Sequence, residues 1–470
     1  MFISAKDLNI DYLYTIGDHV RIIETSESIV LADISDISYD LDTVYLRADI
    51  NEPPRPSLRV EQTVRTILAI RQLQKKKTNI LCTSHSSIPN GSLKENFQIL
   101  KEMLEREIDP INPEVKNIIF VKSLEEMKRA NEKYKESLIF LDNVRKTVPE
   151  ERNPPVNSSN TEFWKLVKDT TKINGALSSC HRDNLSLRVF SDGCFCNSYF
   201  ARELEDITKI YNSENGNIKI WGIAGAKRDK LRAILLTEGK EDLLVNLDGG
   251  PIFVLLLWAL INKAPSLGRT LPHTIGKLNK ELIEKFFGDK WESTKAEALK
   301  IAEKIDNGVI DIILPIDVLI EDEDGIEKVV DLRDIDKGRF ISIGPNTIKM
   351  IGNISTKRIF LQNGSVEPRT TLETKSESIT YLLIKSLLKR VDELFLNGGD
   401  TVSDVRSLEN ELELAKYRKD KLRELAVGGF VVHWWNYLNK GREIPPGVEF
   451  AYIGSLRNLY MVRRRQQDFT

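Results

Sequence analysis

The chain alternates short runs of β-branched and aliphatic residues with longer segments whose apolar residues recur every three or four positions. The first pattern is typical of buried strands and the second of amphipathic helices. The predicted strands are Thr43–Asp49, Thr78–Ser84, Lys116–Val121, Ser137–Leu141, Asn217–Ile223, Asp242–Leu247, Val309–Ile320, Arg358–Leu361 and Asp392–Leu396. The predicted helices include Leu58–Lys75, Leu93–Glu107, Ile252–Ile261, Ser293–Lys304 and Ser376–Lys389. Because strands that alternate with helices form βαβ units, the pattern predicts an α/β fold with mostly parallel sheets.

Chain length and the number of strands indicate two domains. The predicted strands are too many for one typical sheet, and 470 residues are long for a single core. We therefore predict two doubly wound Rossmann-like domains with parallel sheets, joined by the helix Ser198–Tyr211. The predicted boundaries are 1–197 for the first domain, 198–216 for the interdomain helix, 217–440 for the second domain and 441–470 for a C-terminal segment that returns to the first domain. The first 42 residues are predicted to form a short appended β-rich element.

Composition and charge narrow the class of protein. Lys and Arg number 68 against 70 Asp and Glu, so no global positive field favours nucleic acid, and an anion site requires a local cluster of cations. No apolar run reaches the roughly 18 residues that span a bilayer, and the N-terminus lacks the pattern of a secretion signal. Four cysteines form no disulfide framework, and Cys194 and Cys196 alone are a weak metal signal. These features favour a cytoplasmic protein that binds neither nucleic acid nor membrane.

The end of the first predicted strand carries three polar side chains on one face. Arg47, Asp49 and Asn51 alternate along the strand, so they point the same way, and Pro53 and Pro54 then stop the ladder. A cation, a carboxylate and an amide together indicate a site for a polar, anionic ligand. The alternative is a solvated strand end with an internal Arg–Asp pair.

Further cations and histidines follow the other strands of the first half. Arg59 opens the first predicted helix, His85 and Arg145 follow two strands, and His181 and Arg182 follow a later turn. Ligands of parallel sheets bind beyond the carboxyl ends of the strands, and guanidinium groups bind carboxylate and phosphate oxygens through two hydrogen bonds. The set therefore predicts a pocket for a small, multiply anionic metabolite. For any single arginine the alternative is a surface ion pair.

Glycine turns follow the strands of the second half. They are Ala224–Lys230, Asp248–Gly250, Gln362–Ser365 and Asn397–Thr401. A small-residue turn that leads into a helix leaves backbone N–H groups that hold phosphate, and Asp400 in the last turn could hold hydrated magnesium. Together the turns predict a nucleotide site, whereas each one alone is more often a plain tight turn.

In this order, from about residue 41 to 450, the motifs resemble the phosphoglycerate kinase family. Leu314–Val318 and Ile343–Pro345 match further markers of that family. The resemblance implies that the first domain binds 3-phosphoglycerate through Arg47, Asp49, Asn51, Arg59, His85, Arg145 and Arg182. It implies that the second domain binds the nucleotide through Gly225, Ala226, Lys227, Gly249, Gly250, Asn363, Gly398, Gly399, Asp400, Thr401, Gly428 and Gly429. Arg59, Lys227 and Lys230 would be catalytic, and Asp400 would bind the metal.

The activity that the resemblance implies is reversible phosphoryl transfer between 1,3-bisphosphoglycerate and ADP, which gives 3-phosphoglycerate and ATP in glycolysis and gluconeogenesis. Its cofactor would be magnesium with ATP or ADP, and the protein would be a monomer. The acceptor is a carboxylate that is already ionised, so the reaction needs no general base. Positioning and charge neutralisation would carry the catalysis, with closure about the helix Ser198–Tyr211.

Several positions depart from the family pattern. Ile88 stands where the family has an arginine, Gly175 replaces an aspartate, and Lys230 follows Lys227 after three residues instead of four. Phe430 replaces the third glycine of a loop, and the bulky Trp434 and Trp435 follow. The alternative is thus a catalytically degenerate homologue that binds an anionic metabolite or nucleotide without transfer. The sequence suggests no role for the first 40 residues or for the basic run Arg463–Arg465.

Overall fold

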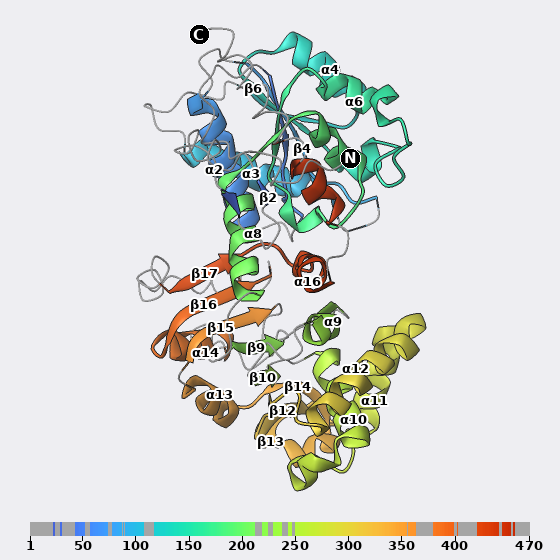
Figure 1. The fold of residues 1–470 in the computed structure, drawn as a ribbon, viewed down its shortest axis with the longest axis vertical. Helices are drawn as coiled ribbons and strands as arrows, with labels where there is room; N and C mark the ends of the chain where they lie inside the picture. Colours follow the sequence, from blue (N-terminus) through green and yellow to red (C-terminus); the bar gives the residue numbers. More distant parts are fainter. Residues whose placement is uncertain are drawn as a thin grey trace. The chain divides into compact units, whose positions relative to one another are not determined.

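The fold is mixed α/β and divides into two compact units (Figure 1). The computed structural model describes residues 22–23, 29–30, 43–51, 57–73, 78–86, 88, 90–107, 117–211, 219–223, 229–236, 243–246, 250–354, 356–362, 379–398, 402, 421–440, 444–452 and 455. The first unit contains Met1–Thr208 and Lys440–Thr470, and the second contains Lys209–Asn439. The boundary between the two units along the chain falls within helix α8 (Ser198–Tyr211). The bounds of α8 confirm the helix predicted over these residues.

The first unit is built on a six-stranded sheet. Its order is β5-β6-β4-β3-β7-β8, and all neighbouring strands are parallel. The strands are β3 (Val44–Arg47), β4 (Ile80–Thr83), β5 (Asn117–Val121), β6 (Ser137–Leu141), β7 (Thr171–Asn174) and β8 (Phe195–Cys196). The first four confirm predicted strands. The pattern misses β7 and β8 because β7 has a single aliphatic residue and β8 has two residues in all.

Helices cover both faces of this sheet. The described helices of the unit include α2 (Leu58–Leu73), α3 (Lys94–Glu107), α4 (Leu124–Lys133), α5 (Val144–Thr147), α6 (Glu162–Val167), α7 (Leu185–Arg188) and α8. Val44 and Leu46 belong to the core cluster that α2 and α3 complete on one face. Tyr45 points to the other face, where its ring lies 5.7 Å from Phe163 of α6 and 5.8 Å from Phe190. Since side chains alternate, Arg47 shares the face of Tyr45.

The second unit contains a parallel sheet and a small antiparallel sheet. The parallel sheet has the order β11-β10-β9-β15-β16-β17, and the antiparallel sheet has the order β13-β12-β14. The strands are β9 (Lys219–Ile223), β10 (Leu243–Asn246), β11 (Ile312–Ile313), β12 (Asp317–Glu321), β13 (Glu327–Asp331), β14 (Arg339–Ile343), β15 (Thr356–Gln362), β16 (Val391–Asn397) and β17 (Leu422–Leu425). The prediction of one strand over Val309–Ile320 is wrong. The segment forms β11 and β12 in different sheets, and Pro315 between them has no N–H for either ladder.

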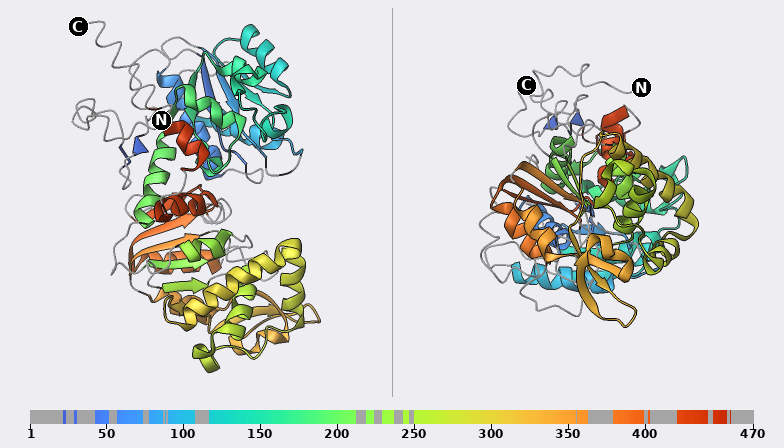
Figure 2. Two further views of the ribbon diagram at one scale, coloured as in Figure 1. Left: turned by 45° about the vertical axis from the view of Figure 1, so that its right-hand side comes forward. Right: turned by 90° about the horizontal axis from the view of Figure 1, so that it is seen from below.

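The helices of the second unit include three that pack side by side, α10, α11 and α12 (Figure 2). The helices are α9 (Asp229–Leu236), α10 (Pro251–Lys263), α11 (Lys277–Phe287), α12 (Trp291–Asp306), α13 (Pro345–Gly352), α14 (Ile379–Leu388) and α16 (Phe430–Lys440). As the apolar run predicts, α10 is largely buried. None of the helices that the structure describes is long and apolar enough to cross a membrane.

The described residues near the two ends of the chain form a short strand pair and a segment that contacts the first unit. Before residue 43 the described elements are β1 (Ile22–Ile23) and β2 (Ile29–Val30), which pair antiparallel. Near the other end, the backbone N–H of Gly447 donates to the carbonyl of Cys180 at 2.9 Å, and the thiol of Cys194 donates to the carbonyl of Ala451 at 3.5 Å. A segment from the C-terminal end of the chain thus packs on the first unit, next to the turn that precedes Arg182.

Candidate functional site

The register of the first sheet brings the predicted site residues to one edge. Arg47 of β3 lies opposite Thr83 of β4 and Asn174 of β7, and Thr83 lies opposite Leu141 of β6. Because all four strands are parallel, the segments that follow them leave the sheet at the same edge. Those segments carry Asp49, Asn51, His85, Arg145 and Arg182.

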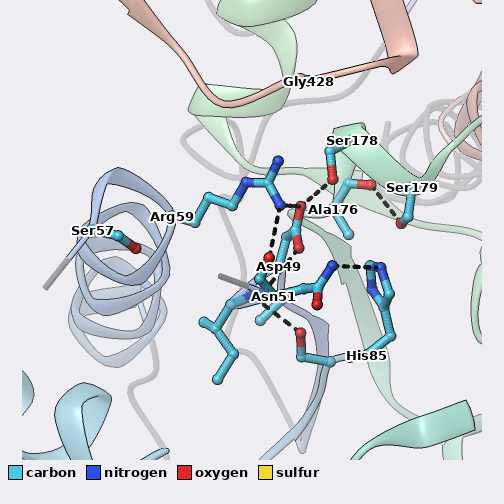
Figure 3. Close-up of polar contacts among 12 residues, drawn as sticks. Asp49, Asn51, Ser57, Arg59, His85, Ala176, Ser178, Ser179 and Gly428 are labelled. Carbon is cyan, nitrogen blue, oxygen red and sulfur yellow. Dashed lines mark hydrogen bonds and ion pairs between the residues drawn. The ribbon is translucent and has the colours of Figure 1, made fainter. Parts of the chain in front are cut away.

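An ion pair between Arg59 and Asp49 forms the first part of the site (Figure 3). Nη1 of Arg59 lies 3.2 Å from Oδ2 of Asp49, and the side chains are only 11% and 7% exposed. The same Nη1 donates to the carbonyl of Asn51 at 3.4 Å, and the hydroxyl of Ser178 donates to Oδ2 of Asp49. Arg59 starts α2, so these contacts fix the first turn of that helix against the end of β3.

Arg47 and His85 form a second, fully buried part. Nη2 of Arg47 lies 3.2 Å from Nδ1 of His85, and Nε2 of His85 lies 3.4 Å from Nδ2 of Asn51. Arg47 is 0% exposed and His85 is 3% exposed. Burial lowers the pKa of His85 well below its ordinary value, and the charges of Arg47, Arg182 and Arg59 lower it further. His85 is therefore a neutral imidazole and adds no charge to the site.

Arg145 and Arg182 retain more exposure. Nη1 of Arg145 donates to the carbonyl of Ser86 at 3.0 Å, directly after His85. Nε of Arg182 donates to Nε2 of His181 at 3.0 Å. Partial burial lowers the pKa of Arg182, while the charge of Asp49 raises it and that of Arg47 lowers it. The structure thus brings the predicted substrate-binding residues together. Arg145 and Arg182 are more exposed than Arg47 and His85, and the side chain of Arg59 is 11% exposed.

Four residues that the sequence reasoning missed complete this cluster. They are Tyr45, Glu151, Ser178 and Ser186, and all but Ser178 are fully buried. Tyr45 carries a signal that could have found it, because it lies two residues before Arg47 on the same strand face. Glu151 lies in the Pro/Asn/Ser-rich loop, where no periodicity marks a buried residue.

The glycine at position 175 has a packing explanation. A Cβ atom there would lie 2.7 Å from Nδ2 of Asn197. Asn197 uses that space to donate to Thr66 at 3.0 Å and to accept the N–H of Phe200 at 2.8 Å, which caps α8. The departure at Gly175 therefore makes room for the residue that starts α8.

The strands that precede the predicted glycine turns end at one edge of the second sheet. Gln362 at the end of β15 lies opposite Ile223 and Asn397, and Asn397 lies opposite Leu425. Gly398 donates to the carbonyl of Leu425 at 3.1 Å and has a φ of 120°, which favours glycine. Gly250 caps the start of α10. The strands that precede these turns thus end at one edge of the sheet.

The loops after β16 and β17 are joined by one buried asparagine. Nδ2 of Asn397 donates to the carbonyl of Gly428 at 3.0 Å, and the N–H of Gly428 donates to its Oδ1 at 2.9 Å. Gly398 and Gly428–Gly429 are therefore neighbours. The other predicted nucleotide residues lie outside the described residues, as do Lys227 and the side chain of Lys230; these nucleotide residues are Gly225, Ala226, Gly249, Asn363, Gly399, Asp400 and Thr401.

No group of three or more metal-ligating side chains is placed to hold an ion within the part of the chain that the structure describes. Asp400, the predicted metal ligand, lies outside that part.

The bulky residues at the start of α16 are buried. Phe430, Trp434 and Trp435 are each 0% exposed. The rings of Phe430 and Trp434 stack at 6.4 Å, and Trp435 lies 5.6 Å from Phe360 of β15 and 6.2 Å from Tyr211. Trp435 thus packs α16 against the sheet, and Phe430 and Trp434 pack against each other.

The two segments Leu314–Val318 and Ile343–Pro345, which match markers of the family, lie against each other. The Asp317 carboxylate accepts the backbone N–H groups of Asn346 at 3.0 Å and of Thr347 at 2.7 Å, at the start of α13. A Cβ on Gly344 would meet that carboxylate at 2.4 to 2.7 Å. An aspartate on β12 and a glycine before α13 are therefore required together.

These features define a two-unit α/β protein whose candidate ligand residues lie at the carboxyl edge of each sheet. A family model named phosphoglycerate kinase matches residues 34–417. The chain belongs to the phosphoglycerate kinase family.

Individual relatives are distant. A phosphoglycerate kinase from Thermococcus kodakarensis is 27% identical over 226 residues, which are 45% of this chain and 53% of the relative. The match thus spans about half the length of that relative. The crystal structure of phosphoglycerate kinase from Pyrococcus horikoshii is 19% identical, with a TM-score of 0.66 over 90% of this chain and 99% of the other. The structure of phosphoglycerate kinase from Coxiella burnetii is 18% identical, with a TM-score of 0.56 over 90% of this chain and 98% of the other. These two structures support the fold.

Proposed function

We propose that the protein is a phosphoglycerate kinase that transfers a phosphoryl group reversibly between 1,3-bisphosphoglycerate and ADP. The observation that carries the proposal is the cluster at the edge of the first sheet. There Asp49 orients Arg59, and Arg145 and Arg182 add two more guanidinium groups. Such a set suits a small acid that carries both a carboxylate and a phosphate.

The chemistry of this reaction fits the residues of the cluster. The acceptor carboxylate of 3-phosphoglycerate is ionised at neutral pH, so the enzyme has no proton to remove. His85 is neutral and buried, and thus acts as a hydrogen-bonding group and not as a base. Catalysis then rests on positioning and on charge neutralisation by arginines that are already oriented before substrate binds.

The nucleotide half of the proposal rests on the glycine turns of the second sheet. Gly398 and Gly428 lie side by side through Asn397, at the edge where the other predicted turns begin. Lys227, Lys230 and Asp400 are proposed to contact the phosphates and the magnesium ion that accompanies them. The departures at Gly175 and Phe430 both take part in packing, where Asn197 fills the space beside Gly175 and Phe430 stacks on Trp434.

A coupled assay with 3-phosphoglycerate and magnesium ATP tests the proposal. We expect turnover by the full-length protein and a strong loss of activity in Asp400→Ala, with unchanged affinity for 3-phosphoglycerate by calorimetry. Asp324→Ala is the matched control, because Asp324 is an exposed aspartate of the same unit. Absence of turnover together with intact binding of 3-phosphoglycerate would show a binding protein instead of a kinase.

A further inference from the structure

A chain of buried hydrogen bonds runs behind the ion pair of Arg59 and Asp49. It begins at Glu151, whose carboxylate accepts the hydroxyl of Ser186 at 2.7 Å and its backbone N–H at 2.8 Å. The same hydroxyl accepts Nε–H of Arg47 at 3.0 Å. Arg47 in turn lies against Nδ1 of His85. Glu151, Ser186 and Arg47 are each 0% exposed.

This chain of bonds is held in place from the sheet. The hydroxyl of Tyr45 lies 2.9 Å from that of Thr83 and donates to the carbonyl of Ser186 at 3.2 Å. Because a carbonyl only accepts, the Thr83 hydroxyl is the donor to Tyr45. Ser186 is thus fixed through its carbonyl, its N–H and its hydroxyl, and it can occupy only one position between Arg47 and Glu151.

The direction of the bonds determines which nitrogen of His85 carries the proton. A guanidinium group has donors only, so Nδ1 of His85 must accept from Nη2 of Arg47. A neutral imidazole with an unprotonated Nδ1 carries its proton on Nε2. The third nitrogen of Arg47, Nη1, donates to the carbonyl of Ala48 at 2.6 Å, so each of the three nitrogens has a partner inside the protein.

The protonated Nε2 of His85 has a consequence for Asn51. Figure 3 shows the amide of Asn51 directed at that nitrogen. Two donors cannot bond to each other, and Arg47 cannot turn into an acceptor. The amide of Asn51 is therefore oriented with Oδ1 toward His85, since amide oxygen and nitrogen are assigned from their partners. Its Nδ2 then lies on the side of the amide away from His85.

We infer that Arg47 is a positioning residue and not a substrate ligand: with Ser186 and Glu151 it forms a buried relay that fixes the tautomer of His85 and, through it, the amide of Asn51. The inference rests on the proposed function in one respect, that Asn51 faces the acid substrate. It revises the sequence-based assignment of Arg47 to substrate binding. Burial lowers the pKa of His85 most, and the neighbouring groups Arg47, Arg182, Arg59 and His181 lower that pKa further.

The first experiment measures the tautomer directly by nitrogen-15 NMR of the full chain, labelled at its five histidines. The variant His85→Gln assigns the signal by removing it. We expect a wild-type His85 with a proton on Nε2 only, unchanged between about pH 5.5 and 8. In Arg47→Met, we expect both tautomers and a protonation step nearer to the ordinary value. Arg71→Met is the matched control, because Arg71 is a buried arginine that binds the carbonyl of Thr78, before β4 begins.

The second experiment breaks the relay without touching a candidate ligand. Ser186→Ala removes the hydroxyl between Arg47 and Glu151, and we expect the dissociation constant for 3-phosphoglycerate to rise about tenfold, the effect of one hydrogen bond. The control is Ser137→Ala, which removes a hydroxyl that is equally buried and bonded, at the start of β6. We expect that variant to bind like the wild type. If Arg47→Met does not fold, the nitrogen spectrum of Ser186→Ala shows the same tautomer mixing.

Three outcomes would overturn the inference. They are a wild-type His85 protonated on Nδ1, a His85 signal that neither Arg47→Met nor Ser186→Ala changes, and unaltered binding of 3-phosphoglycerate by Ser186→Ala. A wild-type protein that does not bind 3-phosphoglycerate refutes the proposed function and with it the role of Asn51. The nitrogen spectrum still decides whether the relay fixes His85, so the two failures are distinguishable.

Discussion

Arg47 and Arg59, two arginines at the carboxyl edge of the first sheet, differ in what surrounds them. Arg47 is fully buried, and its three nitrogens bind Ser186, Ala48 and His85. The side chain of Arg59 is 11% exposed; it pairs with the carboxylate of Asp49 and donates to the carbonyl of Asn51. The first arrangement holds the protein together, whereas the second presents a cation to a ligand. Arg47 ends β3 and Arg59 lies in the first turn of α2, and their burial and their partners, which the residue type does not show, separate the two roles.

Arg59→Lys tests the role of the second kind of arginine. A lysine carries the charge but lacks the planar fork, so it cannot pair with Asp49 and face the phosphoryl group at once. We expect kcat to fall by about 10- to 100-fold with little change in KM, because the lost contact is made in the transition state. Steady-state kinetics measure both. Arg65→Lys is the control on the same helix, where the arginine is exposed and pairs with Glu61 at 3.0 Å; a similar loss there would contradict the assignment.

The neutral state of His85 predicts how stability depends on pH. Its pKa is lowered in the folded protein, so below pH 6.5 the unfolded chain takes up a proton that the folded chain does not. Stability from this group is complete above pH 6.5 and is lost as the pH falls, by at most about 1.4 kcal/mol per pH unit. Urea unfolding between pH 7 and about pH 5 measures the slope. We expect a smaller slope in His85→Gln, whereas His273→Gln, at an exposed histidine, should match the wild type.

At the scale of elements, the sequence predicts strands well where they are buried on both faces. Ser137–Leu141 is predicted with its observed bounds because every residue is buried and the segment reads as one apolar run. β7 and β13 are missed because polar residues fill the strand, and their places come from pairing with distant neighbours. The division of Val309–Ile320 into two strands likewise depends on which sheet each half joins.

The residues of the candidate site likewise divide into those that the sequence predicts and those that depend on distant contacts. Asp49, Arg59 and His85 are predictable because they follow strong strand signals or begin a strong helix. Ser186 and Glu151 are not, because Ser186 contacts Arg47 across 139 positions of sequence and Glu151 acts through Ser186. Candidate ligand residues are thus easier to predict from the sequence than the residues that fix them in position.

The start of helix α16 offers a test of the altered glycine loop. Phe430→Gly restores a third glycine, but it removes a fully buried ring that stacks on Trp434. We expect a loss of about 4 kcal/mol in the free energy of unfolding and no gain in kcat. Phe286→Gly is the control, at a half-exposed phenylalanine of α11, and should cost about 1 kcal/mol. A Phe430→Gly protein of normal stability and higher kcat would show that Phe430 obstructs catalysis.

At the scale of the whole molecule, each unit has its own sheet and its own set of candidate ligand residues. The boundary within α8 leaves the arginine cluster in the first unit and the described glycine turns in the second. Because neither set needs residues of the other unit for its described contacts, each ligand is expected to bind and stabilise its own unit. A ligand at 100 times its dissociation constant stabilises the state that binds it by about 2.7 kcal/mol.

Hydrogen exchange of the full chain with each ligand alone measures this separation. We expect 3-phosphoglycerate to slow exchange in peptides that contain the ends of β3, β4 and β6, and magnesium ADP to slow exchange in peptides that contain the ends of β16 and β17, because local opening is suppressed where a ligand binds. Arg182→Met should weaken the first pattern alone, and Asp400→Ala the second alone. Protection of the first unit by magnesium ADP alone, or loss of both patterns in one variant, would contradict the assignment of one ligand to each unit.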